Sequence, residues 1–308
     1  MLVCPDCAVY NLPQKTGTCA ACGWKSGQIN GMDDFLSTAD RKSGLFEGYS
    51  QNYEGLAQKN LEKSNIDRRF LRNQAKNLLR YIPDVKNKHV CDVGIGQGFF
   101  CEEALAAGAE KITAVDVAVS FLARFKEHEK VHPYIANAET LPFENTFDVL
   151  ASTDVMEHVL NVGSFLYSVN RALKPGGLAA LRVPFREGLL NYSPHRGYEY
   201  DFGHVRSFNK DLLRIYMRQA GFDQLTFHLD GFTLGTPQPW LYSTPRRKAF
   251  YHKIYHYLDK RLEHPADATL LPPKLARLVM RPVDIVVIGR KAVDVATELH
   301  NYQGANRT

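Results

Sequence analysis

Short apolar runs alternate with amphipathic stretches of helical length along the central part of the chain. The apolar runs predict strands over 88–93, 111–115, 134–136, 147–152, 177–184, 224–229 and 284–288. Apolar residues at helical spacing predict helices over 68–81, 99–107, 120–129, 162–173 and 210–220. Strands that alternate with helices favour a parallel sheet covered on both faces. The pattern therefore predicts an α/β fold with a doubly wound, mostly parallel sheet.

The segment 230–282 interrupts this pattern between the last two predicted strands. It is rich in proline at both ends, and residues 246–264 carry apolar side chains at roughly helical spacing. Residues 241–282 hold nine Lys or Arg and three Asp or Glu, whereas the whole chain has a net charge of +5. We expect a basic amphipathic helix over a cleft or a partner, and a candidate dimer interface. The rest of the chain is nearly neutral, and the sequence leaves the oligomeric state open.

The first 22 residues contain four of the six cysteines, as two Cys-x-x-Cys pairs: Cys4, Cys7, Cys19 and Cys22. Two such pairs supply the four thiolates of a tetrahedral zinc site. Four protein ligands leave no open position, so the zinc is predicted to be structural. Two disulfides are the alternative, but they are rare in cytosolic proteins. The remaining cysteines, Cys91 and Cys101, are expected to be small buried hydrophobic residues.

The chain is expected to be a soluble cytoplasmic protein that does not enter a membrane. No apolar run reaches the length that spans a bilayer, and Cys4 stands where a signal peptide needs its apolar core.

A glycine-rich turn follows the first strand of the predicted sheet. Residues 90–99 read Val-Cys-Asp-Val-Gly-Ile-Gly-Gln-Gly-Phe, so that an acid precedes a Gly-x-Gly-x-Gly turn. Eighteen residues past the last glycine, the next strand ends in Asp116. Glycines let the backbone approach a nucleotide, and an acid at that strand tip can accept hydrogen bonds from two ribose hydroxyls. The two features together predict an adenosine cofactor.

Three further motifs follow in order: Ile-Ala-Asn-Ala-Glu-Thr-Leu-Pro-Phe at 135–143, Phe-Asp-Val-Leu-Ala-Ser-Thr-Asp-Val-Met-Glu-His-Val at 147–159, and Leu-Lys-Pro-Gly-Gly at 173–177. With these motifs, residues 70–293 resemble the class I S-adenosylmethionine-dependent methyltransferases, in particular the branch of the ubiquinone-biosynthesis enzymes. The resemblance implies a Rossmann-like sheet of seven strands whose last two are antiparallel.

The amino-terminal segment resembles a second family. Cys-x-x-Cys-Gly followed by Gly-Gln-Ile-Asn-Gly-Met-Asp-Asp-Phe-Leu at 27–36 is similar to the Trm112-type zinc ribbon. That ribbon activates methyltransferases as a partner and is fused to some of them. The expected organisation is a ribbon at 1–36, linker or lid helices at 37–69, a methyltransferase domain at 70–293 with the insertion 230–282, and a flexible tail at 294–308.

The resemblance implies a set of cofactor-binding residues. Tyr49 and Tyr53 belong to the lid, although packing of a linker onto the body is the alternative. In the family an Asp contacts the adenine amino group where this chain has Asn137, whose side-chain carbonyl can still accept. The full expected set is Tyr49, Tyr53, Asp92, Gly94, Gly96, Gly98, Asp116, Val117, Asn137, Ala138, Glu139, Ser152 and Thr153.

The candidate catalytic residues are His204, Arg206 and His158. In this branch a His-x-Arg before a Phe and a helix lies beside the cleft, and residues 204–208 match that pattern within a cluster of polar residues that begins at His195. His204 is a candidate base for removing the proton of a methyl acceptor. The alternative is that His204 caps loops beside the helix and that His158 serves packing.

The sequence favours a methyltransferase with S-adenosylmethionine as cofactor and a structural zinc ion. Its acceptor is expected to be a small molecule or a glycan-like metabolite, methylated at oxygen. A ribosomal- or transfer-RNA base methyltransferase is the second interpretation, because a ribbon and a basic insertion can bind phosphates. A non-catalytic binding partner is the third, and the intact glycine turn with Asp116 argues against it.

Overall fold

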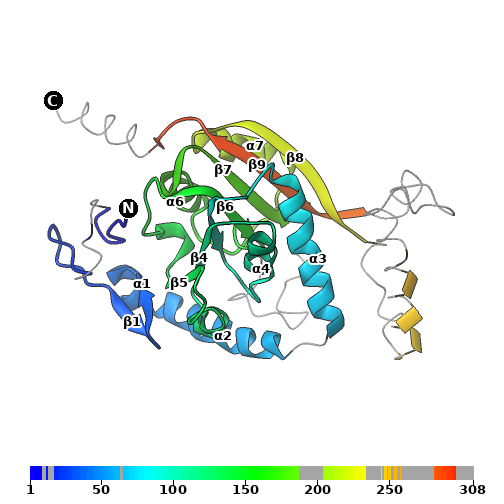
Figure 1. Ribbon diagram of the computed structural model, residues 1–308, viewed down its shortest axis with the longest axis horizontal. Coiled ribbons are helices and arrows are strands. Elements are labelled where there is room, and N and C mark those ends of the chain that lie inside the picture. Colours follow the sequence, from blue (N-terminus) through cyan, green and yellow to red (C-terminus); the bar gives the residue numbers. More distant parts are fainter. Residues whose placement is uncertain are drawn as a thin grey trace.

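The structure is a computed structural model of the chain (Figure 1). It describes residues 1–8, 12, 17–62, 65–186, 204–233 and 281–295, together with a few positions between 244 and 257. The amino-terminal elements are β1 (Gly27–Ile29), β2 (Met32–Asp34), α1 (Thr38–Lys42), α2 (Gly44–Leu61) and α3 (Asn65–Tyr81).

The central elements alternate as predicted. They are β3 (His89–Val93), α4 (Phe99–Ala106), β4 (Lys111–Asp116), α5 (Val119–Ala123), β5 (Val131–Ile135), the 3₁₀ turn η1 (Ala138–Thr140), β6 (Phe147–Thr153), α6 (Val162–Ala172), β7 (Leu173–Pro184), α7 (Lys210–Gln219), β8 (Phe222–Thr233) and β9 (Arg281–Lys291).

One sheet runs through the molecule in the order β1-β2-β5-β4-β3-β6-β7-β9-β8. The neighbours from β2 to β7 are parallel, whereas β9 is antiparallel to both β7 and β8. Seven neighbouring strands of this order, β5-β4-β3-β6-β7-β9-β8, confirm the predicted doubly wound, mostly parallel sheet. In Figure 1, β8 and β9 lie at the side of the sheet opposite to β1 and α1.

Two apolar layers cover the faces of this sheet. One layer joins α3, α4 and α5 to the strands and includes Leu78, Phe100 and Phe121. The other joins α6 and α7 to the strands and includes Phe165 and Met217. Strands buried on both faces explain why the sequence shows continuous apolar runs without alternation.

The zinc-ribbon segment is continuous with the main sheet. β2 pairs in parallel with β5, and the N–H of Phe35 donates to the carbonyl of Ile135 at 2.8 Å. Phe35, 3% exposed, packs between Trp24 and Tyr134 at ring distances of 5.5 and 5.7 Å. The sequence predicts a small satellite module here, and the structure adds two strands and a shared aromatic layer.

Several predicted boundaries were wrong for local reasons. The helix predicted over 120–129 ends at Ala123. The chain then continues in turns whose N–H groups donate to the carbonyl three residues earlier, as the N–H of Phe125 does to the carbonyl of Leu122. β7 begins at Leu173, before the predicted start at 177, because Leu173 pairs with Phe147 ahead of a β-bulge.

Some predicted features lie outside the described residues. These are most of the 230–282 insertion with its helix over 246–264, the polar residues from His195 to Asp201, and the tail beyond residue 295. In the part of the chain that the structure describes, no helix combines the length and apolarity that crossing a membrane requires.

We expect Phe35→Ala to lower the free energy of unfolding by about 3–5 kcal/mol, because it leaves a cavity between Trp24 and Tyr134. Ile29→Ala is the matched control, since Ile29 is 38% exposed on β1. Urea unfolding measures both. Equal costs for the two variants would show that the ribbon does not pack on the sheet as described.

Candidate functional site

The glycine turn leaves open space at its middle residue and is tightly packed at its two ends. A Cβ atom at Gly94 would lie 2.2 Å from Val155, and one at Gly98 would lie 2.3 Å from the ring of Phe125. Both glycines also have positive φ angles, of 74° and 73°. A Cβ at Gly96 would meet nothing within 4 Å. The turn is therefore closed on the protein side and open where a ligand would approach.

Asp116 holds the turn in place from the end of β4. Its carboxylate accepts hydrogen bonds from the N–H of Ala118 at 2.9 Å and from that of Gly96 at 3.3 Å. The N–H of Gly94 donates to the carbonyl of Val115 at 2.8 Å. Burial raises the pKa of Asp116 to about 6. Val117, a member of the expected cofactor-binding set, follows Asp116 and is half-buried.

Asp92 is a second buried acid beneath the turn. It is 1% exposed, and the thiol of Cys101 donates to it at 3.2 Å. Burial raises its pKa to about 7, and the nearby charge of Asp116 acts in the same direction. Cys101 is buried as predicted, and it also donates a hydrogen bond that no sequence pattern indicates.

Helix α2 brings Tyr49 and Tyr53 to the acids of this site. The two rings stack at 5.8 Å, and Tyr53 packs edge-on against Phe121 at 6.1 Å. Burial raises the pKa of both phenols, and the charges of Asp116 and Glu157 raise it further. Those charges act on the phenols because α2 lies beside the ends of β4 and β6.

Two polar contacts fix α2 in this position. Nε2 of Gln97, within the glycine turn, donates to the carbonyl of Asn60 at 2.8 Å. The carboxylate of Glu54 accepts from both the N–H and the hydroxyl of Ser120 at the start of α5. The sequence did not single out Gln97 or Glu54, because an isolated Gln or Glu carries no recognisable pattern.

The segment after β5 brings Asn137, Ala138 and Glu139 to the same edge of the sheet. The N–H of Ala136 donates to the carbonyl of Asp116 at 3.3 Å, so Asn137 follows directly beside the acid. Oδ1 of Asn137 accepts from the N–H of Glu139 at 3.0 Å. The carboxylate of Glu139 accepts from the N–H groups of Leu160 and Asn161, at 2.8 and 3.1 Å. Glu139 thus holds the loop beyond β6, and its predicted contact with the cofactor remains a prediction.

The end of β6 carries Ser152, Thr153 and Asp154. Ser152 is 3% exposed, and its hydroxyl has no hydrogen-bond partner among the described residues. Thr153 is half-buried. A buried hydroxyl of this kind fits a ligand that supplies its partner.

A charged cluster, with Arg182 and Asp284 buried and Asp154 exposed, fixes the backbone after β6. Asp154 has a φ of 55°, and its N–H donates to the carbonyl of Arg182 at 3.0 Å. The Arg182 side chain, itself 3% exposed, forms ion pairs with Asp154 at 2.9 Å and with Asp284. Burial raises the pKa of Asp284 to about 7, against the opposing effect of Arg182. Sequence reasoning missed this cluster, although isolated charges within apolar strands were the available signal.

Glu157, His158 and His204 meet at the loop that follows Asp154. The imidazole rings of His158 and His204 lie 4.7 Å apart, nearly perpendicular. Nε2 of His204 lies 3.9 Å from Oε1 of Glu157, which is fully buried. One ligand atom from each residue falls within 4.8 Å of the others, so the three side chains could hold a divalent ion.

Arg206 lies beside these side chains in a supporting position. Its guanidinium donates to the main-chain carbonyls of Val159 and Leu160. The N–H of Val205 also donates to the carbonyl of Glu157 at 3.1 Å. Segment 204–206 is therefore bonded to the loop that carries His158, which brings together two of the predicted catalytic histidines.

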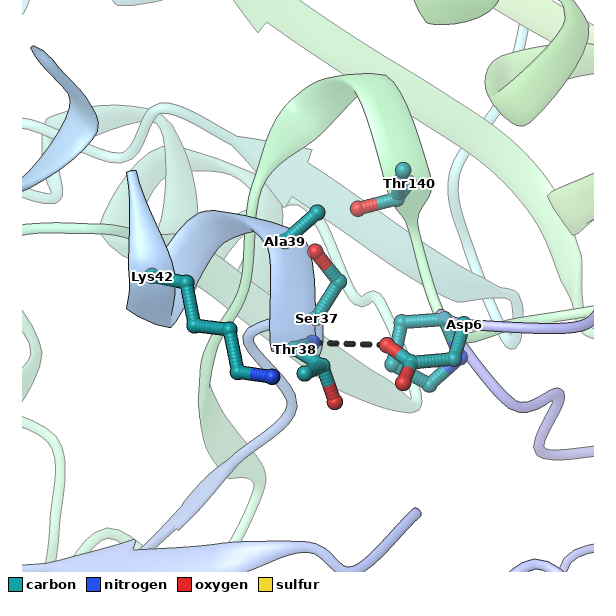
Figure 2. Close-up of a pocket in the computed structure, with 7 residues that line it drawn as sticks. Asp6, Ser37, Thr38, Ala39, Lys42 and Thr140 are labelled. Carbon is teal, nitrogen blue, oxygen red and sulfur yellow. Dashed lines mark hydrogen bonds between the residues drawn. The ribbon is translucent and has the colours of Figure 1, made fainter. Parts of the chain in front are cut away.

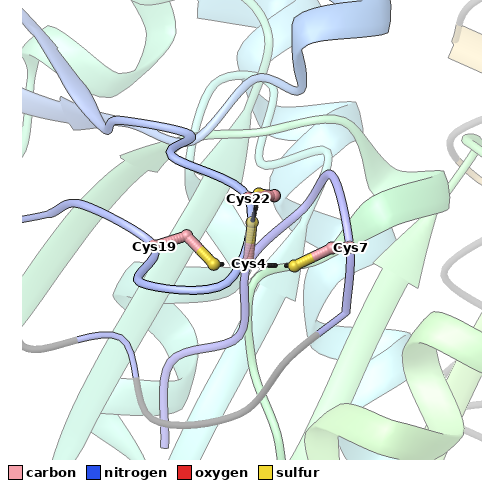
Figure 3. Close-up of side chains that lie close together, drawn as sticks. All are labelled: Cys4, Cys7, Cys19 and Cys22. Atoms are coloured by element: carbon pink, nitrogen blue, oxygen red, sulfur yellow. Dashed lines mark hydrogen bonds between the residues drawn. The ribbon is translucent and has the colours of Figure 1, made fainter.

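The four amino-terminal cysteines converge (Figure 3). The sulfurs of Cys4 and Cys22 are 3.6 Å apart, and those of Cys7 and Cys19 are 3.5 Å apart. Zinc–thiolate bonds of about 2.3 Å in a tetrahedron separate sulfurs by roughly 3.8 Å. A hydrogen bond from the backbone N–H of Cys22 lowers the pKa of Cys19 to about 7, whereas burial raises the pKa of Cys4 to about 12. The donor set fits a structural zinc ion.

We expect one zinc ion per chain in protein purified without chelator, measured by elemental analysis. Cys4→Ser should lose that zinc and weaken the ribbon, because Cys4 is fully buried between the other ligands. Cys91→Ser is the matched control and should keep full zinc. Protein without metal, or a Cys4→Ser variant with full metal, would contradict the assignment.

Comparison with known proteins identifies the region that holds these motifs. Residues 91–181 match the family described as "Methyltransferase domain". A tRNA U34 carboxymethyltransferase of Pseudoalteromonas atlantica is 28% identical over 152 residues, 46% of this chain and 46% of that protein. A ubiquinone biosynthesis O-methyltransferase of Nitrobacter winogradskyi is 38% identical over 94 residues, 29% of this chain and 36% of that protein. The chain thus spans less than half the length of these relatives.

Among solved structures, phosphoethanolamine N-methyltransferase 2 of Haemonchus contortus, in complex with S-adenosylmethionine, is similar with a TM-score of 0.48. It is 18% identical, and the alignment covers 72% of this chain and 53% of that one. The family match covers the strands that carry the glycine turn, Asp116 and the loop after β6. Residues 91–181 are therefore similar to a methyltransferase domain, and the two relatives support a class I S-adenosylmethionine-dependent methyltransferase.

Proposed function

We propose that the chain is a methyltransferase that binds S-adenosylmethionine at the carboxyl edge of its sheet and methylates a small-molecule or glycan-like acceptor at oxygen. The observation that carries this proposal is the glycine turn bonded to Asp116, with open space at Gly96. Tyr49 and Tyr53 would cover the cofactor, and Asp116 would accept from its ribose hydroxyls.

The cofactor, when bound, supplies a methyl group on a positively charged sulfur. The buried carboxylates of Asp92 and Asp116 lie on the turn side of the site and suit a cationic ligand. The hydroxyl of Ser152 is available for a ligand at the end of β6. Burial beneath α2 limits the access of water to this space.

His204 is the proposed base for an acceptor hydroxyl. Its imidazole would take the acceptor proton, and the Glu157 carboxylate, 3.9 Å away, would stabilise the resulting imidazolium. His158 packs against this ring and limits its orientation. Arg206 acts only through the backbone that it holds. This arrangement supports oxygen methylation, since proton removal must accompany transfer to a hydroxyl.

A transfer-RNA or ribosomal-RNA acceptor is the second candidate. One similar protein is named for tRNA U34, and residues 241–282 concentrate the positive charge of this chain. The small-molecule acceptor is favoured because the basic excess is confined to that one segment, whereas RNA-binding surfaces extend over many phosphates.

Asp116→Ala should weaken binding of S-adenosylmethionine by at least about a hundredfold, because it removes two charge-assisted hydrogen bonds worth roughly 1.5–3 kcal/mol each. Titration calorimetry measures the affinity. Binding to the unchanged protein should also weaken as the pH falls through about 6. The pKa of Asp116 is raised to that value, so its carboxylate becomes protonated there and accepts the ribose hydrogen bonds less well. Asp211→Ala, at an 82% exposed side chain, is the control. Unchanged affinity in Asp116→Ala would refute the cofactor assignment.

Exchange of Arg246, Arg247 and Lys248 for Glu separates the two acceptor classes. For a small anionic acceptor only its KM should rise. For RNA, binding should weaken steeply, and the salt slope should fall by about one unit per lost phosphate contact. We expect the first result in methyl-transfer assays with metabolite and RNA pools. Tight, salt-sensitive binding of RNA by the unchanged protein would favour the second candidate instead.

A further inference from the structure

Asp40 and Asn137, far apart in sequence, meet where the adenine end of the cofactor is expected. Asn137 follows β5 next to Asp116, and Asp40 lies on α1, just after the ribbon. Nδ2 of Asn137 donates to Oδ1 of Asp40 at 2.8 Å. Asp40 is only 9% exposed. A buried carboxylate from the amino-terminal segment thus contacts the residue that stands in place of the family's adenine-binding Asp.

Asp40, together with the N–H of Glu139, determines which way the Asn137 amide faces. Oδ2 of Asp40 accepts from the N–H and the hydroxyl of Ser37, at 3.0 and 2.6 Å, so the carboxylate is fixed by a capping box. A carboxylate only accepts, and the amide nitrogen of Asn137 must therefore face it. Oδ1 of Asn137 is directed away, toward the N–H of Glu139, and retains a second lone pair.

We propose that Asp40 is a positioning residue that makes Asn137 read the 6-amino group of adenine. The inference rests on the proposed cofactor. Held by Asp40, Asn137 presents an oxygen that can accept from that amino group, and the pair performs the task of a single carboxylate. A purine with oxygen at position 6 would place an acceptor against an acceptor and would bind more weakly.

The ribbon takes part in this arrangement through α1. Oδ1 of Asp6, which lies between the zinc ligands Cys4 and Cys7, accepts from the N–H of Thr38 at 2.6 Å (Figure 2). Thr38 is the first residue of α1, two positions before Asp40. Asp6, Thr38 and Thr140 of η1 line a crevice of about 470 Å³, and no residue of the glycine turn lines it. Thr38 therefore connects a zinc knuckle to the residue that orients Asn137.

The test compares S-adenosylhomocysteine with S-inosylhomocysteine, in which a carbonyl replaces the 6-amino group of the purine and N1 carries a proton. Titration calorimetry on the full chain with zinc should show a preference of about tenfold for the adenosyl ligand. In Asp40→Asn, the new oxygen should stay with its two Ser37 donors, and the new amide should face Asn137. Asn137 then either keeps its bond from the N–H of Glu139 and faces a donor with its own NH2, or reverses and loses that bond, so the preference should fall or invert.

Two further variants complete the test. Asp40→Ala removes the acceptor without adding a donor, so the preference for the adenosyl ligand should fall without inverting. The same variant serves as the test if Asp40→Asn does not fold. Asp33→Asn changes another ribbon acid, bonded to Gln28, and should keep the tenfold preference. A simple structural role for Asp40 would weaken both ligands equally.

The outcomes separate this inference from the proposed function. Binding of neither ligand by the unchanged protein would overturn both. A preference that stays at its original value in Asp40→Asn and Asp40→Ala, with zinc content and melting temperature retained, would overturn only the role of Asp40. Loss of the preference in both Asp40 variants and its retention in Asp33→Asn would support it.

Discussion

The hydrogen bonds between the glycine turn and the end of β4 are the constraint on which the site depends. They join the loop after β3 to the end of β4. The N–H of Gly94 donates to the carbonyl of Val115, and the N–H of Gly96 donates to the carboxylate of Asp116. Because β3 and β4 are parallel, their carboxyl ends meet at one edge of the sheet. The other site residues follow from this edge: Asn137 continues β5, Ser152 ends β6, and α2 spans the opening.

The amino-terminal segment and helices α1 and α2 belong to this same edge. β2 extends the sheet beside β5, and α1 and α2 then pass along the ends of the strands. As a result Asp40 contacts Asn137, and Tyr53 lies near Asp116. A metal-bound knuckle that fixes α1 would therefore influence cofactor binding without contacting the cofactor, which is the physical content of the proposed role for Asp40.

The sequence predicted the features that depend on periodicity and on local motifs. The seven central strands, the glycine turn and the convergence of four cysteines were all predicted from residues close together along the chain. The pairing of β2 with β5 was not, since three-residue strands carry no periodic signal. The contacts of Asp40 with Asn137 and of Arg182 with Asp284 span about a hundred residues, and no local pattern encodes them.

We propose that the glycine turn, the end of β4 and α2 form one cofactor site. Hydrogen exchange of the full chain, with and without saturating S-adenosylhomocysteine, tests it most directly. We predict slower exchange in three separate segments, at residues 94–99, 116–118 and 49–57, because the ligand would be held between them. Protection of none of these segments, or protection confined to another part of the chain, would contradict the account.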